Sequence, residues 1–316
     1  MKILIPDSKT ITLGDISFDR FKEFGEVEIY ELSGAKLMPE RSRDTDIILC
    51  NKVPMNAETL RNAKNLKYIG LFATGYNNID LEYCKSRNIT VCNAAGYSTD
   101  AVAQHTFALI LDHYSRINEY NNFVQDGGWK RSDTFSPFVY GTHELFGKTI
   151  GIVGFGTIGK RVAQIAAAFG MNIVYYSRSE KEFDGAVRLP LEELVQVSDI
   201  VTVHCPLNDE SRGMFDDELF SKFKPTAFFV NTARGGIADE QSLRRALESG
   251  KIAGAAADVL VTEPMGEDCP LIGVKNMTLT PHTAWAAKET RERCVQQAYE
   301  TLKAYLNGKP INVVSR

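Results

Sequence analysis

A glycine-rich turn in the middle of the sequence limits the possible folds more than any other feature. Residues 154–159 read Gly-Phe-Gly-Thr-Ile-Gly, directly after an apolar run at 149–153 and before a helix-compatible stretch. In such a strand-turn-helix unit, Gly154 permits the tight turn, Gly156 lets the backbone approach a pyrophosphate, and Gly159 lets the helix pack closely on the strand. The turn therefore predicts a dinucleotide site at a helix N-terminus.

Short apolar runs on both sides of this turn predict two parallel sheets. Polar, helix-compatible segments separate the runs, and strands that alternate with helices pair in parallel. The sequence thus predicts an α/β protein in which a Rossmann dinucleotide-binding domain is inserted into a flavodoxin-like substrate domain. The expected strands are 2–5, 46–50, 66–71 and 89–92 in the first series, and 149–153, 172–176, 200–204, 227–231, 254–259 and 278–279 in the second.

Two long helical stretches mark the expected crossings between these domains. An apolar run at 101–113 follows several polar N-cap residues, and 286–306 reads as one helix that ends before a glycine and a proline. A chain of 316 residues is also long enough for two hydrophobic cores. We expect a substrate domain at 1–98 and 288–316, and a dinucleotide-binding domain at 99–287.

Composition and charge exclude several classes of protein. The formal net charge is -4 and no long run of Lys or Arg occurs, so neither nucleic acid nor an anionic membrane is an expected partner. The six cysteines lack the spacing of a zinc site, and no tight His/Cys cluster suits a metal. No apolar stretch is long enough for a signal peptide or a membrane span. These features predict a cytoplasmic protein with reduced thiols and no metal.

The residues after the second strand of the nucleotide unit bear on the choice of cofactor. An NAD-binding unit places an acidic residue there, which binds the ribose hydroxyl groups. This sequence has Ser177, Arg178 and Ser179 instead. Two hydroxyl groups and a guanidinium suit a 2′-phosphate, so we predict that NADP(H) is preferred and that NAD(H) is possible. The alternative is that Arg178 is a solvated side chain on a loop.

Three side chains with complementary chemistry, Arg234, Glu263 and His282, lie at or just after predicted strand ends. Ligands of doubly wound sheets bind outside the carboxyl ends of the strands, so these three loops are expected to converge. Hydride transfer to a 2-keto acid needs a cation for the carboxylate, a proton donor for the carbonyl oxygen, and a partner for that donor. An arginine, a histidine and a glutamate meet these three needs.

Seven short segments together resemble one enzyme family. They are NKVP at 51–54, ATGYNNID at 73–80, YSTDAVAQ at 97–104, the turn at 154–159, NTARGG at 231–236, TEP at 262–264 and PHTAW at 281–285. With these segments the chain resembles the D-isomer-specific 2-hydroxyacid dehydrogenases over nearly its whole length, and most nearly their glycerate dehydrogenase (hydroxypyruvate reductase) branch.

The resemblance implies roles for the candidate site residues. His282 would be the acid/base, Glu263 its hydrogen-bonded partner and Arg234 the substrate clamp. Backbone N–H groups around Thr74 and Gly75 would receive the substrate carboxylate, and Lys52 is a further candidate substrate contact. Many NAD-using members have Asp where this chain has Ser177. The candidate cofactor contacts are Thr74, Thr106, Gly154, Gly156, Thr157, Ile158, Gly159, Ser177, Arg178, Ser179, His204, Cys205, Thr232, Ala233, Asp258, His282 and Ala284.

The resemblance leaves the substrate open. Hydroxypyruvate/D-glycerate and glyoxylate/glycolate are the main candidates, with phosphoglycerate and D-lactate dehydrogenase as alternatives. Glu263 argues against formate dehydrogenase, which pairs its histidine with glutamine. A dinucleotide-sensing corepressor-like binding protein is the alternative from another class. The resemblance and the aromatic segment 129–140 also predict a homodimer.

The other histidines have weaker claims to a functional role. His105 and His113 lie in the apolar run at 101–113, and we expect both to be structural. His204 ends a predicted strand, where packing and cofactor contact are equally expected.

Overall fold

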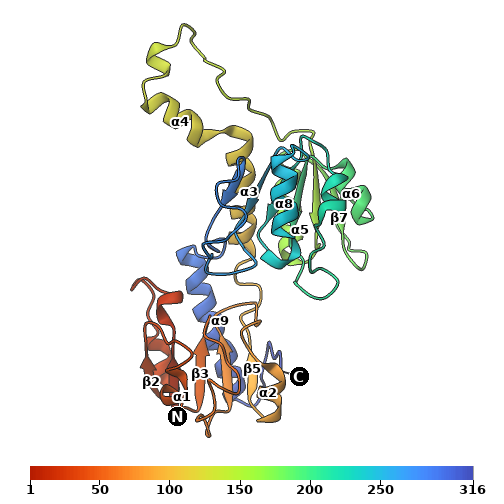
Figure 1. Cartoon of the computed structure of the whole chain (residues 1–316). Coiled ribbons are helices and arrows are strands. Elements are labelled where there is room, and N and C mark those ends of the chain that lie inside the picture. The colour runs from red at the N-terminus through yellow and green to blue at the C-terminus, as the bar shows by residue number, and fades with distance from the viewer. Residues whose placement is uncertain (316) are drawn as a thin grey trace. The chain divides into compact units, whose positions relative to one another are not determined.

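The computed structural model describes residues 1–315, which form two compact units (Figure 1). The first unit contains the residues up to Ser98 and those from Ala286 onward, and the second unit is Thr99–Trp285. The chain therefore passes twice between the units, and the second unit is an insertion into the first.

The first unit is built on a parallel five-stranded sheet in the order β2-β1-β3-β4-β5, which is the flavodoxin-like order. Its strands are β1 (Lys2–Ile5), β2 (Glu26–Ile29), β3 (Ile47–Cys50), β4 (Tyr68–Leu71) and β5 (Thr90–Cys92). The predicted fold class is confirmed. Strand β2 was not predicted, because this edge strand alternates glutamate with apolar residues and is never fully buried.

Short helices and one long helix surround this sheet. They are η1 (Ser8–Thr10), η2 (Asp19–Phe24), α1 (Met38–Arg41), α2 (Leu81–Ser86) and α9 (Lys288–Leu306). Helix α9 begins two residues later than the predicted 286. It is joined to the rest of the unit by the Arg291 guanidinium, which donates to both carboxylate oxygens of Asp15 at 2.9 and 2.8 Å.

The second unit is built on a parallel seven-stranded sheet in the order β12-β11-β10-β9-β6-β7-β8. Its strands are β6 (Thr149–Val153), β7 (Asn172–Tyr176), β8 (Ala186–Arg188), β9 (Ile200–Val203), β10 (Phe228–Asn231), β11 (Gly254–Ala257) and β12 (Met277–Leu279). The strand order reverses between β6 and β9, and doubly wound sheets bind their ligands at such a switch point. The short edge strand β8 was not predicted, because most of its surface is exposed.

Helices cover both faces of this sheet. On one face, Phe107 of α3 (Thr99–Ser115) and Val162 of α5 (Thr157–Ala168) pack in one core cluster with Ile150. On the other face, Leu194, Phe220 and Leu243 pack in a second cluster. They belong to α6 (Leu191–Val197), α7 (Asp217–Ser221) and α8 (Glu240–Glu248). The predicted run at 101–113 lies inside α3.

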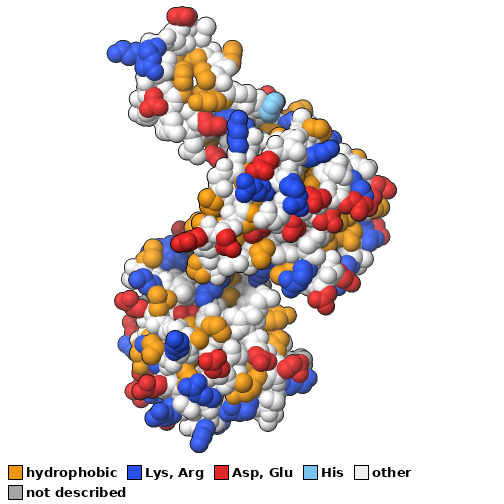
Figure 2. Space-filling model, in the orientation of Figure 1, with side chains coloured by type: hydrophobic (Ala, Val, Ile, Leu, Met, Phe, Trp, Pro, Cys, Tyr) orange, Lys and Arg blue, Asp and Glu red, His pale blue; other side chains and the backbone are white. Residues whose placement is uncertain are grey.

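An arm of aromatic residues extends the second unit. It consists of α4 (Ile117–Gln125), η3 (Trp129–Arg131) and the segment that follows to residue 142 (Figure 1). The Trp129 indole N–H donates to the carbonyl oxygen of Phe135 at 3.0 Å, which holds the tip of the arm together. Phe135 and Phe138 are nonetheless 90% and 92% exposed. Figure 2 shows hydrophobic side chains gathered on this arm.

Membrane-spanning helices, metal-binding clusters and disulfides are absent from the part of the chain that the structure describes. Within residues 1–315, no helix is long and apolar enough to cross a bilayer. In the same residues, no group of three His, Cys, Asp or Glu side chains is placed to hold a metal ion. None of the six cysteines forms a disulfide.

Burial of His113 couples folding to pH. The His113 ring stacks on Phe228 of β10 with the ring centroids 4.0 Å apart. Burial lowers its pKa from 6.5 to about 4. Because the unfolded chain takes up this proton at a higher pH than the folded chain, the stability that the neutral ring contributes is present above pH 6.5 and is lost as the pH falls toward 4.

We therefore expect the free energy of unfolding to decrease between pH 6.5 and 4, and to decrease less in His113→Gln than in the parent protein. Glutamine keeps a polar side chain of similar size but does not take up a proton. Urea unfolding at about pH 7 and about pH 4.5 measures both decreases. Equal decreases in the two proteins would show that His113 is not the group responsible.

Candidate active site

His282 and Glu263 face each other at the carboxyl edge of the seven-stranded sheet. Nδ1 of His282 lies 2.7 Å from Oε2 of Glu263. A carboxylate in this position holds the proton on Nδ1, which leaves Nε2 as the nitrogen that can exchange a proton with a ligand. The two side chains keep 27% and 35% of their surface exposed, so a ligand can reach them.

The loop that carries Glu263 is held by two carboxylates. The backbone N–H of Leu260 donates to Oε1 of Glu263 at 2.9 Å. The neighbouring N–H of Val261 donates to Oε1 of Glu240 at 2.7 Å. Because Glu240 is the first residue of α8, the position of this loop is tied to the start of that helix.

The turn that carries His282 is organised by Asp258, which is 1% exposed. His282 has a φ of 54°, in the left-handed region. Its N–H donates to the carbonyl oxygen of Asp258 at 2.8 Å. The Asp258 carboxylate accepts from the N–H groups of Thr283 and Ala284 at 2.8 and 2.9 Å and from the Thr280 hydroxyl at 2.6 Å. A left-handed non-glycine residue costs about 1–3 kcal/mol, and these bonds hold it there.

Arg234 follows β10 in a loop that touches the Glu263 loop. The amide of Asn231 donates to the carbonyl oxygen of Arg234 at 2.9 Å and fixes the turn. The next residue, Gly235, has no room for a side chain, because a Cβ there would lie 1.9 Å from the carbonyl carbon of Leu260. Glycine thus lets the two loops meet backbone to backbone. The structure brings Arg234, Glu263 and His282 to one sheet edge, on neighbouring strands.

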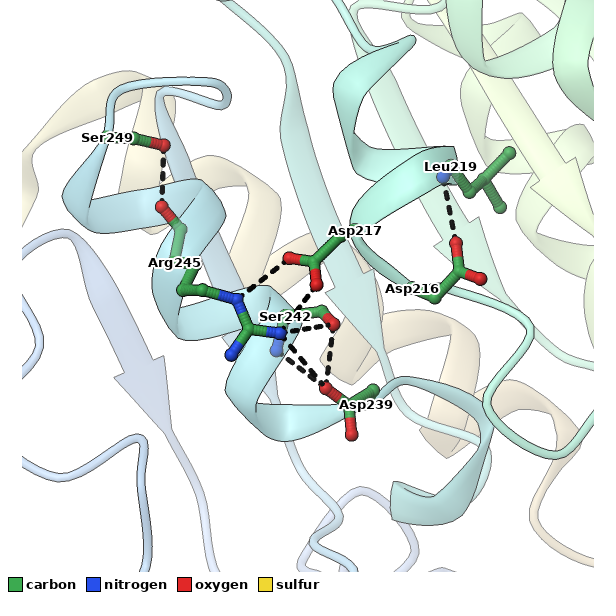
Figure 3. A network of polar contacts seen from close by, with 7 residues as sticks. All are labelled: Asp216, Asp217, Leu219, Asp239, Ser242, Arg245 and Ser249. Carbon is green, nitrogen blue, oxygen red and sulfur yellow. Dashed lines mark hydrogen bonds and ion pairs between the residues drawn. The ribbon is translucent and has the colours of Figure 1, made fainter.

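A polar network joins helix α8 to helix α7 (Figure 3). The Arg245 guanidinium of α8 donates to both carboxylate oxygens of Asp217 on α7, at 2.9 and 2.6 Å. The same guanidinium holds the pKa of Asp217 below its ordinary value. Asp239 caps α8 by accepting from the N–H of Ser242 at 2.7 Å. The network therefore fixes the start of α8, where the loop ends.

The glycine-rich turn has the shape that a pyrophosphate needs. Gly154 has a φ of 97°, and a Cβ there would lie 2.4 Å from the backbone nitrogen of Cys205. At Gly159 a Cβ would lie 2.2 Å from the carbonyl oxygen of Gly154, whereas Gly156 faces open space. Helix α5 begins at Thr157, directly after Gly156. The residues present therefore fit a nucleotide at this turn.

A pocket of about 470 Å³ opens beside the turn. Gly156 and Thr157 line it together with the cationic side chains Lys160, Arg161 and Lys181. These cations were not predicted, although Lys160 and Arg161 directly follow the fingerprint. The pocket therefore offers positive charge to an anionic ligand.

The turn after β7 contains the residues expected to bind a 2′-phosphate. Arg188 of β8 donates from Nη2 to the carbonyl oxygens of Ser177 and Arg178 at 2.9 and 3.1 Å. The Arg178 side chain is 75% exposed and lies 3.8 Å from the Glu210 carboxylate. Arg188 was not predicted as a site residue, because the strand that contains it, β8, was not predicted. It adds a second positive charge to this turn.

Other candidate cofactor residues lie near each other in the same unit. The hydroxyl groups of Thr106 and Thr232 are 3.2 Å apart and buried. Burial raises the pKa of the Cys205 thiol to about 11 and lowers that of His204 to about 3. Within residues 1–315, Nδ1 of His204 is buried with no hydrogen-bond partner. A neutral His204 beside the glycine-rich turn suits packing and ligand contact alike.

Three of the candidates, Lys52, Thr74 and Gly75, belong to the first unit. Lys52 follows β3, and Thr74 and Gly75 follow β4, so all three lie at the carboxyl edge of the five-stranded sheet. The Lys52 N–H donates to the buried Asp7 carboxylate at 2.6 Å. Burial raises the pKa of Asp7, and N–H donors including that of Lys52 counter part of the shift. The Thr74 hydroxyl donates to the carbonyl oxygen of Ala94 at 2.8 Å.

Comparison with known proteins identifies the family. The family profile described as "D-isomer specific 2-hydroxyacid dehydrogenase, NAD binding domain" matches residues 107–284. Over the full length of both chains, this chain is 36% identical to a hydroxypyruvate reductase of Blautia hydrogenotrophica. It is 37% identical to a glycerate dehydrogenase of Methylorubrum extorquens, over 87% of each chain.

A solved structure agrees with this result. The NADPH-dependent glyoxylate/hydroxypyruvate reductase of Sinorhizobium meliloti, in complex with NADP and malonate, superposes with a TM-score of 0.86 at 27% identity. The match covers 99% of this chain and 96% of that one. The predicted resemblance is confirmed: this chain belongs to the D-isomer specific 2-hydroxyacid dehydrogenase family.

Proposed function

We propose that this protein is an NAD(P)-dependent dehydrogenase that interconverts a small 2-keto acid and its D-2-hydroxy acid, either hydroxypyruvate and D-glycerate or glyoxylate and glycolate. The observation that carries the proposal is the 2.7 Å hydrogen bond between His282 and Glu263. This pair shares its sheet edge with Arg234 and the glycine-rich turn, and relatives with these activities support the choice of substrate.

The proposed chemistry divides among three side chains. A bound nicotinamide nucleotide supplies or accepts the hydride. Nε2 of His282 gives a proton to the carbonyl oxygen during reduction and takes it back during oxidation. Glu263 accepts from Nδ1 and holds the ring in place, and Arg234 pairs with the substrate carboxylate. We assign Lys52 and the N–H groups of Thr74 and Gly75 as further carboxylate contacts.

Seventeen residues are proposed cofactor contacts. They are Thr74, Thr106, Gly154, Gly156, Thr157, Ile158, Gly159, Ser177, Arg178, Ser179, His204, Cys205, Thr232, Ala233, Asp258, His282 and Ala284. Support comes from the open space at Gly156, the contact between Thr106 and Thr232, and the unpaired Nδ1 of His204. We also propose that the second unit is the dinucleotide-binding domain and that the first unit is the substrate domain.

Initial rates test the substrate. We expect turnover of hydroxypyruvate or glyoxylate to exceed that of pyruvate and of 3-phosphohydroxypyruvate, with NADH and NADPH each tried. Fastest turnover of one of the latter two would move the assignment to D-lactate or phosphoglycerate dehydrogenase. No turnover of any, with dinucleotide still bound, would favour a corepressor-like binding protein.

Substitution of the pair tests the mechanism. His282→Ala should lower kcat by about 10²–10⁴-fold and leave the dissociation constant of the dinucleotide nearly unchanged, because it removes the proton donor. Glu263→Gln keeps an oxygen that can accept from Nδ1 but removes the charge, so we expect a smaller loss of kcat. His143→Ala, at an exposed histidine on a loop, is the matched control. A kcat in His282→Ala equal to that of the control would remove His282 from its assigned role.

We propose that NADPH is preferred over NADH. Support comes from the turn at 177–179, which lacks the carboxylate that would repel a 2′-phosphate, and from the guanidinium groups of Arg178 and Arg188. Because the Arg178 side chain is 75% exposed, water and salt screen its charge. We therefore expect the free energy that Arg178 contributes to NADPH binding to lie at the lower end of the range for a charge-assisted hydrogen bond.

Kinetics with both cofactors test this preference. The parent protein should give a higher kcat/KM with NADPH than with NADH, and Arg178→Ala should reduce that ratio by about tenfold. Added salt should also reduce the ratio in the parent. Arg43→Ala, which removes an exposed arginine in the first unit, controls for net charge. Equal or NADH-favouring values in the parent would refute the preference.

We propose that two chains form a homodimer through the aromatic arm. Phe135 and Phe138 are nearly fully exposed, and a groove of about 350 Å³ beside them is lined by Phe123 and Trp129. A solvated loop does not need such an apolar surface, whereas an interface does. We also propose that the protein works in the cytoplasm, since none of its six cysteines forms a disulfide, which suits a reducing compartment.

Light scattering tests the dimer. The parent protein should have twice the mass of the chain at micromolar concentration, and the double substitution Phe135→Asp with Phe138→Asp should shift it toward the monomer. Leu13→Asp replaces an equally exposed apolar residue, 87% exposed, in the first unit and should leave the mass unchanged. A mass equal to that of one chain for the parent protein would refute the dimer.

A further inference from the structure

A histidine of helix α3 contacts the turn that carries His282. Nε2 of His105 lies 3.0 Å from the Thr280 hydroxyl oxygen. That hydroxyl lies 2.6 Å from Oδ1 of Asp258. Nε2 of His105 is also 3.5 Å from the same carboxylate oxygen. The three side chains therefore form one polar chain, from α3 through β12 to the end of β11.

The direction of each hydrogen bond in this chain is fixed. A carboxylate only accepts, so the Thr280 hydroxyl donates its single proton to Asp258. The hydroxyl oxygen can then only accept from the other side, and Nε2 of His105 must carry the proton that it donates. His105 therefore polarises the hydroxyl toward Asp258 and strengthens the next bond along the chain.

The chain ends on the backbone of the catalytic turn. Besides the Thr280 hydroxyl, the Asp258 carboxylate accepts from two backbone N–H groups of this turn. The N–H of Thr283 donates to Oδ1, and the N–H of Ala284 donates to Oδ2. His282 lies between Thr280 and these two residues, in a left-handed conformation with φ 54°. A shift of Thr280 or Asp258 would therefore move the His282 ring relative to Glu263.

The two contacting segments also lie close to the two points where the chain passes between the units. His105 comes soon after Thr99, where the second unit begins, and Thr280 comes shortly before Trp285, where it ends. The hydrogen bond between His105 and Thr280 therefore joins the first and last segments of the second unit. The orientation of the catalytic turn thus depends on the first turns of α3.

We propose that His105 is a positioning residue that holds the His282 turn in its active geometry through Thr280 and Asp258. The inference rests on the proposed function of His282 as acid/base. It extends the sequence-based expectation that His105 is structural.

Steady-state kinetics provide the first test. His105→Leu removes the donor and should lower kcat by roughly tenfold to a hundredfold, with little change in KM for the keto acid. A misplaced proton donor stabilises the transition state less well but leaves substrate binding unchanged. His105→Gln places an amide N–H near the position of Nε2 and should restore kcat to within a few-fold of the parent. His113→Gln alters a buried histidine of the same helix that does not touch the turn, and it should leave kcat unchanged.

A double-mutant cycle tests the path through Thr280. Thr280→Val removes the hydroxyl and keeps the shape of the side chain. If His105 acts through this hydroxyl, His105→Leu should lower kcat much less in Thr280→Val than in the parent. Independent, multiplicative effects of the two substitutions would overturn the proposed path.

Hydrogen exchange in the cofactor-free protein tests the positioning without turnover. In His105→Leu the peptide that contains residues 280–286 should exchange about tenfold faster than in the parent, whereas His105→Gln and His113→Gln should match the parent. Unchanged exchange in His105→Leu, or equal impairment of the Leu and Gln variants, would overturn the proposal. Absence of turnover in the parent would overturn the proposed function instead, and the exchange comparison would still decide the role of His105.

Discussion

The site depends on one buried carboxylate, that of Asp258. It is 1% exposed and accepts from two backbone N–H groups and from the Thr280 hydroxyl. A buried carboxylate is tolerated only when several donors satisfy it, and here these donors come from the turn around His282. The carboxylate and the turn therefore stabilise each other. Without this carboxylate the turn around His282 would lose the bonds from Thr280, Thr283 and Ala284 and keep only its backbone bonds.

The first unit uses the same physical solution at its own sheet. Asp7 follows β1, is 1% exposed, and accepts from the N–H groups of Asn51, Lys52 and Val53 after β3. Parallel strands end at one edge, and the loops there have N–H groups that no strand pairs. A buried aspartate after one strand collects these donors from a neighbouring loop. In both units this arrangement orders a loop that carries a proposed ligand contact.

The sequence reveals features that are local in the chain. The glycine-rich turn, the alternation of strands and helices, and the placement of Arg234, Glu263 and His282 at strand ends could all be predicted. Strands β2 and β8 could not, since short, exposed edge strands lack an apolar run, and Arg188 was lost with β8. The contact of His105 with Thr280 joins residues 175 apart, so no sequence spacing indicates it. Tertiary hydrogen bonds of this kind become visible only in the fold.

The structure separates a rigid catalytic part from an adaptable cofactor part. Gly235 packs against the backbone of Leu260, and Glu240 accepts from the N–H of Val261, so the Arg234 and Glu263 loops are held against each other. Such preorganisation suits proton transfer, where a small displacement has a large kinetic cost. The Arg178 side chain, in contrast, is 75% exposed, and its nearest charged partner is the Glu210 carboxylate at 3.8 Å, so solvent and salt screen its charge. The proposed 2′-phosphate contacts at 177–179 therefore lie apart from the buried carboxylate and hydrogen bonds that hold the His282–Glu263 pair.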